Sequence, residues 1–324
     1  MHEDGRETLT VGSLFTGIGG LDLAVGGEHG WMCEYDKHCR GVLAERFPGV
    51  PCYPDVRELG ADAPRVDVLC GGYPCQPFSV AGKRGGETDP RHLWPEFARL
   101  IGLLRPRFAV LENVRGHLGL GFDAVLAHLA GMGYDARWGV VRASDVGAPH
   151  QRARLFVVAT DADWQGRQGA EPARGRLLPT GSRDAAPDAD ERDLRAGRGR
   201  RRVESGADAR ADKTATSDTA SAERRDEERD RVGTAAKRTA EHRERARAVA
   251  WGVYEPAIRR WEHALGRPAP RPTDDRGRLM PEFVEWMMGF PDGWTAGPAR
   301  KHRLRMLGNA VVPQQAALAL ELLA

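Results

Sequence analysis

Within residues 10–159, short apolar runs alternate with amphipathic stretches that have helical spacing, and glycine-containing turns separate them. Strands that alternate with helices indicate an α/β layer fold built on a mostly parallel sheet. Helices are expected on both faces of that sheet. The strands are expected at 9–15, 30–33, 66–70, 108–111 and 155–159, and the helices at 93–104 and 122–132.

The rest of the chain divides into two further parts. Charged residues of both signs dominate 161–250, and large apolar residues are rare there. Such a segment buries too little surface to offset its ordering entropy, so we expect a disordered, low-complexity insertion. Apolar residues then return at spacings of three and four, which predicts one buried helix face. That face would consist of Trp251, Tyr254, Ile258, Trp261 and Leu265, and helices are expected at 282–288 and 316–323.

Composition narrows the class of protein. The 324 residues are 41% hydrophobic, which is enough for a proper core, and carry 48 Lys and Arg against 46 Asp and Glu. No apolar run approaches the roughly 18–20 residues of a membrane helix, and the N-terminus lacks a signal pattern. The five cysteines include no C-x-x-C pair, which argues against a disulfide scaffold or a zinc ribbon. We therefore expect a cytoplasmic protein.

A glycine loop between the first strand and the first helix is a candidate ligand site. Its spacing, G-x-G-G, is not the G-x-G-x-x-G of dinucleotide sites, because Asp22 stands where the third glycine belongs. Glycines leave the backbone open to a ligand, and a helix N-terminus favours a carboxylate, so an adenosyl amino acid would fit. Phe15 could then pack on the base, while Glu34 and Asp55 could accept hydrogen bonds from the ribose and the adenine amino group. Taken singly, the glycines could equally form a tight turn, and each acid is more often an ordinary surface residue.

Cys75 is the candidate reactive residue. It lies between Pro74 and Pro77 in a stiff loop that follows an expected strand, a location where functional groups are displayed. A lone cysteine is more often a small core residue, and a reactive thiolate needs a polar, electropositive setting.

The chain resembles the cytosine-5 DNA methyltransferases in six motifs that occur in the family's order. They are F-x-G-x-G-G at 15–20, P-C-Q at 74–76, E-N-V at 112–114, Q-x-R-x-R at 150–154, M-G-F-P at 288–291 and G-N-A-V at 308–311. They cover 10–160 and about 278–324 and leave the middle of the chain untouched. Two departures stand out: Ser13 replaces an acid that often opens the glycine motif, and His150 replaces the first glutamine of Q-x-R-x-R.

The resemblance implies an S-adenosylmethionine-dependent methyltransferase fold, of Rossmann-like type, and a chemistry. Cys75 would add to C6 of cytosine, so that C5 becomes nucleophilic enough to take a methyl group. Glu112 would hold or protonate N3, and Arg154 would pair with the O2 side, supported by Arg152. The target base would have to be flipped out of duplex DNA. Gln76 and Ser79 would contact the DNA around it.

The resemblance also implies a cofactor site and a division into domains. No metal is expected, and the residues around S-adenosylmethionine would be Phe15, Gly17, Gly19, Gly20, Glu34, Tyr35, Asp55, Val56, Pro74, Leu93 and Asn309. A catalytic and cofactor-binding domain would span 1–160 and be completed by 300–324. A small target-recognition region would span 251–299.

The resemblance leaves two alternatives of different kinds. One is a tRNA cytosine-5 methyltransferase, and the other is a DNA-binding homologue without catalytic activity. For the leading interpretation the partner is double-stranded DNA, a cognate restriction endonuclease is a further candidate, and monomeric action in a bacterial cell or a phage-infected host is expected. The target sequence does not follow from the motifs.

Overall fold

The computed structural model describes residues 8–74, 93–164 and 249–324. Contacts divide the chain into two compact units, one made of residues 1–180 and 251–324 and the other of 181–250. The insertion expected at 161–250 lies almost wholly outside the described residues and stays a prediction.

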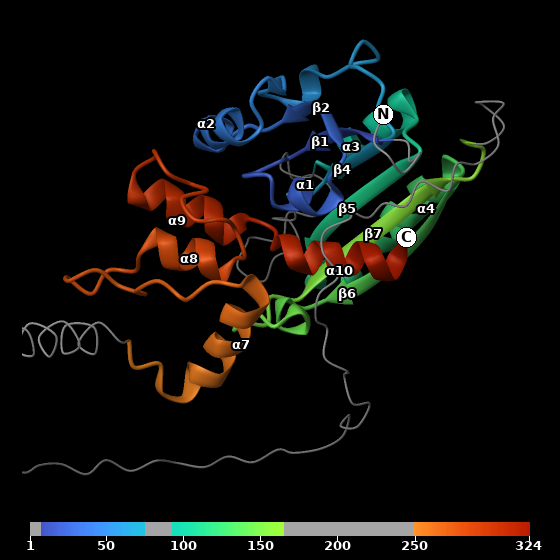
Figure 1. The fold of residues 1–324 in the computed structure, drawn as a ribbon. Helices are drawn as coiled ribbons and strands as arrows, with labels where there is room; N and C mark the ends of the chain where they lie inside the picture. The colour runs from blue at the N-terminus through green and yellow to red at the C-terminus, as the bar shows by residue number, and fades with distance from the viewer. Residues whose placement is uncertain (1–7, 75–92, 165–248) are drawn as a thin grey trace, which may run out of the picture. The chain divides into compact units, whose positions relative to one another are not determined.

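A seven-stranded sheet forms the centre of the first unit (Figure 1). The strand order is β3-β2-β1-β4-β5-β7-β6. The first five strands are parallel, whereas β7 runs antiparallel to both β5 and β6. The expected mixed, mostly parallel sheet is therefore confirmed. The strands are β1 (Thr10–Leu14), β2 (Glu28–Cys33), β3 (Cys52–Tyr53), β4 (Val68–Gly71), β5 (Phe108–Val114), β6 (Tyr134–Val141) and β7 (Arg154–Asp161).

Helices cover both faces of this sheet, also as expected. Short 3-10 helices lie at η1 (Val56–Glu58), η4 (Arg115–Gly119), η5 (Ala143–Val146) and η6 (Gly252–Tyr254). The α-helices of the described residues are α1 (Gly20–Val25), α2 (Lys37–Arg46), α3 (Trp94–Leu104), α4 (Phe122–Gly131), α7 (Glu255–Leu265), α8 (Pro281–Met287), α9 (Arg300–Asn309) and α10 (Pro313–Leu323). No helix within these ranges is both long and apolar enough to cross a membrane.

Two apolar clusters hold the helices to the sheet. On one face, Trp94, Phe97 and Leu100 of α3 pack with Leu129 of α4 against the strands. The three α3 residues recur at helical spacing on one side of the helix, and Pro95 in the first turn needs no hydrogen-bond partner for its nitrogen. On the other face, α1 and α10 pack side by side. The sheet is therefore buried on both sides, as its apolar strands require.

A third apolar cluster joins residues 251–324 to α2 and to the loop before β7. It includes Ile258, Trp261, Trp286 and Phe290, all of which are buried. The indole nitrogen of Trp261 donates to the backbone oxygen of Trp286 over 2.8 Å, which satisfies its polar atom inside the core. The helix face expected from Trp251 onward is only partly right, because Tyr254 is 70% exposed. A 3-10 turn at η6 precedes α7, so residues before Glu255 do not follow the phase of the α-helix.

The buried carboxylate of Glu285 fixes α9 against α8. It accepts hydrogen bonds from the backbone nitrogens of Thr295 (2.7 Å) and Gly293 (3.1 Å) and from the Arg303 guanidinium (3.1 Å). A carboxylate with several charged and neutral donors offsets the cost of its own burial. The turn after α8 and the helix α9 are thereby held together, which matters because α9 forms one wall of the site described next.

Candidate functional site

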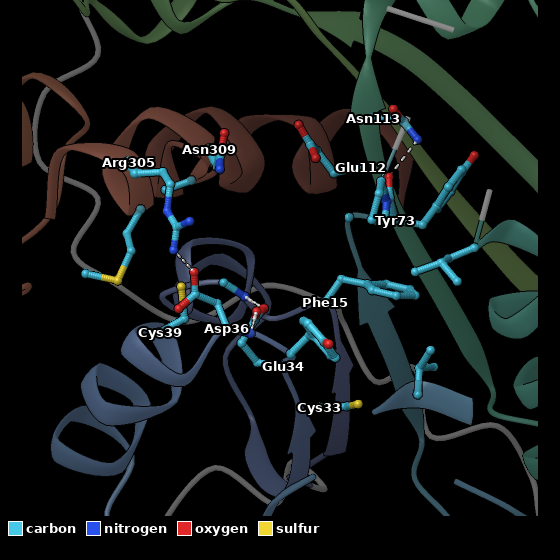
Figure 2. Close-up of a pocket in the computed structure, with 18 of the residues that line it drawn as sticks. Phe15, Cys33, Glu34, Asp36, Cys39, Tyr73, Glu112, Asn113, Arg305 and Asn309 are labelled. Atoms are coloured by element: carbon cyan, nitrogen blue, oxygen red, sulfur yellow. Dashed lines mark hydrogen bonds and ion pairs between the residues drawn. The ribbon is translucent and has the colours of Figure 1, made fainter. Parts of the chain in front are cut away.

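A cavity of about 650 Å³ opens at the carboxyl ends of the parallel strands. In α/β sheets this edge is where ligands bind. Its walls come from the segments that follow β1, β2, β3 and β4, from the end of β5 and from α9 (Figure 2). The lining includes eleven residues expected from the sequence, namely Phe15, Gly17, Glu34, Tyr35, Asp55, Val56, Pro74, Leu93, Glu112, Arg154 and Asn309.

The glycine loop and Glu34 form one part of the cavity wall. The Glu34 carboxylate accepts hydrogen bonds from the backbone nitrogens of Gly17 and Asp36, each at a distance of 2.7 Å. Gly17 has a φ of +59°, and nothing lies within 4 Å of where a Cβ would stand, so its backbone is open to a ligand. Burial raises the pKa of Glu34, while the two amide donors lower it. Each carboxylate oxygen retains acceptor capacity for a further donor, such as a ribose hydroxyl.

Gly19 and Gly20 do not line the cavity. A Cβ on Gly20 would stand 2.3 Å from the backbone oxygen of Val311, and one on Gly19 would stand 2.7 Å from the Phe47 ring. These glycines therefore allow the loop and α1 to pack closely on the rest of the protein, including the segment before α10. Their expected place beside the cofactor remains a prediction, and close packing is the role that the geometry supports.

Phe15 and Asp55 supply an aromatic ring and an acid to another part of the cavity wall. Phe15 follows β1 with a positive φ of 53°, a rare backbone state for a residue with a side chain. Asp55 caps η1 by accepting from the backbone nitrogen of Arg57 over 3.0 Å. Tyr35 lines the cavity but is 80% exposed, so only part of its ring contributes to a wall.

Glu112 and Arg154 form an ion pair at the other part of the cavity. Nε of Arg154 lies 3.0 Å from Oε1 of Glu112, and both side chains are largely buried. Burial raises the pKa of Glu112, against the opposing pull of Arg154 and Arg152. A carboxyl group that keeps its proton to higher pH is suited to general acid chemistry. The E-N-V motif forms the end of β5, which continues past the expected end at 111 to Val114, so the strand itself positions Glu112.

Asn113 stiffens the same strand end. Its side-chain amide donates to the backbone oxygen of Tyr73 over 3.2 Å and its oxygen accepts from the backbone nitrogen of Val114 over 2.8 Å. Tyr73 and Pro74 follow β4 and line the cavity. Cys75, Gln76 and Ser79 lie outside the described residues, so their places stay predictions.

Contacts between α2 and α9 add residues that the sequence did not suggest. The Arg305 guanidinium pairs with the Asp36 carboxylate, and both residues line the cavity (Figure 2). The rings of His38 and His302 stack with their centroids 3.8 Å apart. Asp36 and Arg305 are 269 residues apart in the chain, so no local pattern links them.

Arg152 does not line the cavity either. Its guanidinium donates to the backbone oxygens of Gly308 (2.9 Å) and Ala310 (2.6 Å), on either side of Asn309. Ser13, which stands in place of the motif's acid, is buried and likewise absent from the lining.

The donor set fits S-adenosylmethionine. A volume of about 650 Å³ is within the range of cofactor sites. An open glycine backbone, the carboxylates of Glu34 and Asp55 and the Phe15 ring supply the contacts that an amino acid, a ribose and an adenine need. In the part of the chain that the structure describes, no group of three or more His, Cys, Asp or Glu side chains is placed to hold a metal ion.

Sequence comparison identifies the family. The model of the C-5 cytosine-specific DNA methylase family matches residues 9–321. The chain belongs to this family. The expected resemblance is thus confirmed.

Similar proteins include several Type II methyltransferases. M.DsaV of Dactylococcopsis salina is 36% identical over 162 residues, which cover 47% of this chain and 46% of the relative. M.HpaII of Haemophilus parainfluenzae is 36% identical over 166 residues, with the same two shares. M.NaeI of Lentzea aerocolonigenes is 34% identical over 190 residues, covering 53% of this chain and 46% of the relative. The matched part thus spans about half the length of these curated relatives.

Solved structures confirm the methyltransferase fold. A protein encoded within an E. coli prophage, described as a putative DNA modification methyltransferase, has a TM-score of 0.54 at 20% identity and covers 97% of this chain and 98% of the other. A DNMT2 variant of Spodoptera frugiperda has a TM-score of 0.53 at 18% identity, with the same coverage.

Proposed function

We propose that this chain is a DNA (cytosine-5)-methyltransferase. It would transfer the methyl group of S-adenosylmethionine to C5 of a cytosine flipped out of a specific duplex sequence. The observation that carries the proposal is one cavity in which the Glu34 and glycine-loop wall faces the same space as the Glu112–Arg154 pair. A methyl donor beside the Glu34 and glycine-loop wall and a pyrimidine beside the Glu112–Arg154 pair would therefore meet in one cavity, with no rearrangement of the sheet.

Three residues of the chain, Cys75, Glu112 and Arg154, would each promote a different part of the reaction. The Cys75 thiolate forms a bond to C6 of the cytosine, and the electron pair released into the ring makes C5 nucleophilic. S-adenosylmethionine would supply the electrophilic methyl group, to which C5 would bond as the methyl–sulfonium bond breaks and S-adenosylhomocysteine leaves. Glu112, whose pKa burial raises, donates to N3 as negative charge develops, and Arg154 stabilises the charge on the O2 side. Loss of the C5 proton then releases the thiolate and restores the aromatic ring.

Recognition of DNA is assigned to the region at 251–299, with Gln76 and Ser79 beside the flipped base. Extrusion of a base costs a few kcal/mol, so contacts with the flanking duplex must supply that energy. The near-neutral charge of the chain, with 48 basic against 46 acidic residues, requires that these contacts come from a local surface.

Duplex DNA is the proposed partner, and the chain is proposed to act as a monomer in the cytoplasm of a bacterial cell or an infected host. The names of its relatives as Type II methyltransferases support a cognate restriction endonuclease as a functional partner. Binding of S-adenosylmethionine without a metal remains part of the proposal.

Transfer of labelled methyl to duplex DNA tests the proposal, with wild type beside Cys75→Ser and bisulfite sequencing of the product. We expect label at C5 within one short sequence, and none with the variant. Label in RNA alone would assign the chain to tRNA methylation. Binding of the methyl donor without transfer to either substrate would support the catalytically silent DNA-binding protein.

A further inference from the structure

The two arginines of the Q-x-R-x-R motif contact different parts of the molecule. Arg154 begins β7 and reaches Glu112. Arg152, two residues earlier, donates instead to the backbone oxygens of Gly308 and Ala310. Arg152 is absent from the cavity lining, whereas Gly308 and Ala310 belong to it.

The backbone at Arg152 is held in an unusual state. Its φ is +35°, a conformation that residues with a Cβ avoid. The buried amide of Gln315 on α10 donates to the backbone oxygen of Arg152 over 2.8 Å and to that of Val141 over 2.7 Å. Gln315 thus holds the backbone of Arg152, while the hydrogen bonds to Gly308 and Ala310 hold its guanidinium. A strained residue that is held this firmly is a candidate for a functional constraint.

The carbonyls that Arg152 holds belong to the cavity wall around Asn309. Gly308 and Asn309 end α9, and Ala310 leads to α10, so their carbonyls lack helical partners at this end. Nη2 of Arg152 donates to both carbonyls, so one terminal nitrogen of the guanidinium satisfies two of them at once. Without these bonds, the hydrogen bond from the Ala310 nitrogen to the Leu307 oxygen would tie this turn to α9 but not to the segment before β7.

We infer that Arg152 is a positioning residue, which locks the Gly308–Ala310 wall of the methyl-donor site to the strand that carries Arg154. Through this link the two parts of the cavity keep one relative geometry. The inference rests on the proposed function for the identity of the ligand. It differs from the role expected from the sequence, in which Arg152 supports Arg154 at the base.

Binding of S-adenosylhomocysteine, measured by calorimetry in the absence of DNA, tests this role separately from turnover. We expect Arg152→Met to weaken binding roughly tenfold, less than the loss of a direct contact would, because Arg152 acts on the ligand only through the wall that it holds. Arg152→Lys should recover part of the affinity, because an ammonium is a charged donor with more than one hydrogen and can contact the same carbonyls. Arg137→Met is the matched control, since Arg137 lies on β6 and its described hydrogen bond is a 3.4 Å contact with the C-terminal Ala324.

A double-mutant cycle separates positioning from general stability. If Arg152 acts through the wall, Arg152→Met should add little to the binding defect of Asn309→Ala, because both changes affect one wall. Full additivity would overturn the inference. So would unchanged binding in Arg152→Met with a lower rate of methyl transfer, which would place Arg152 at the base. If the variants change S-adenosylhomocysteine binding as expected but the wild-type protein methylates no DNA, the proposed function would be refuted and the positioning role would stand.

Discussion

Replacement of Glu34 by glutamine offers a direct test of the cofactor site. The carboxylate accepts two backbone hydrogen bonds of 2.7 Å, from Gly17 and Asp36. Glutamine keeps one acceptor oxygen and turns an NH₂ group toward the other donor, so one charge-assisted bond is lost. Hydrogen bonds to charged groups contribute about 1.5–3 kcal/mol, and we take about 2 kcal/mol for this one.

That loss sets the expected size of the effect. The bond holds the glycine loop in place, so a weaker bond reduces the fraction of molecules whose loop is ready to bind. At about 1.4 kcal/mol per factor of ten, a loss of about 2 kcal/mol corresponds to roughly 30-fold weaker binding. Loss of the contact with the ribose would add to this figure. The change is confined to the methyl-donor site, so kcat at saturating donor should fall much less than affinity.

The measurement is the Kd for S-adenosylhomocysteine by titration calorimetry, with the KM for S-adenosylmethionine as a second readout. Glu28→Gln is the matched control, because Glu28 begins the same strand and is exposed. Equal affinities in the Glu34 and Glu28 variants would refute the assignment of Glu34 to the site. A variant with lowered affinity but unchanged melting temperature would support it most clearly.

Three further outcomes are expected. Glu112→Gln should lower kcat by about 10²–10⁴. Wild-type activity should fall as the pH rises through the raised pKa of Glu112, because the general acid loses its proton, and the pH profile of the variant should lack this fall. Trp261→Ala should lower the free energy of unfolding by about 3–5 kcal/mol in urea titrations, because its ring is fully buried, whereas Val253→Ala at an 89% exposed position should not. Burial and the nearby arginines lower the pKa of His150 in the folded protein from its ordinary value of 6.5. As the pH falls, the unfolded chain therefore takes up a proton at this histidine at a higher pH than the folded chain does. Stability should therefore decline as pH falls through and below 6.5, and less so in His150→Gln.

The sequence predicts five of the seven strands and the cavity edge because both depend on local patterns, whereas β3 and β6 were not among the expected strands. Apolar runs mark strands, and the segments after parallel strands meet at one edge of the sheet. Phe15, Glu34, Asp55 and Glu112 follow or end four different strands, and the structure brings all of them to one cavity. Knowledge of the strand order was not needed for that prediction, since every order of parallel strands places their carboxyl ends together.

Features that depend on helix phase or on distant partners were not predictable. Tyr254 fits the spacing of a buried face, but the helix begins only at Glu255, and spacing alone does not reveal where a 3-10 turn ends. The pairing of Asp36 with Arg305 depends on how α9 lies against α2, and Arg46 of α2 donates to the backbone oxygen of Trp294 in the turn before α9. A charged residue near a glycine motif carries no signal of such a partner.

The two arginines of the Q-x-R-x-R motif have different contacts, although the pattern itself matches the family. The resemblance implies that both arginines act at the base, and residues two apart in an extended strand would indeed point to the same side. The strand begins only at Arg154, and the positive φ of Arg152 turns its side chain away from that alternation. A positive φ at arginine has no sequence signature, and the partner of the Arg152 backbone oxygen, Gln315, lies far along the chain on α10. The motif therefore records two separate constraints, one at Glu112 and one on the wall around Asn309, and substitutions at its two arginines should separate them.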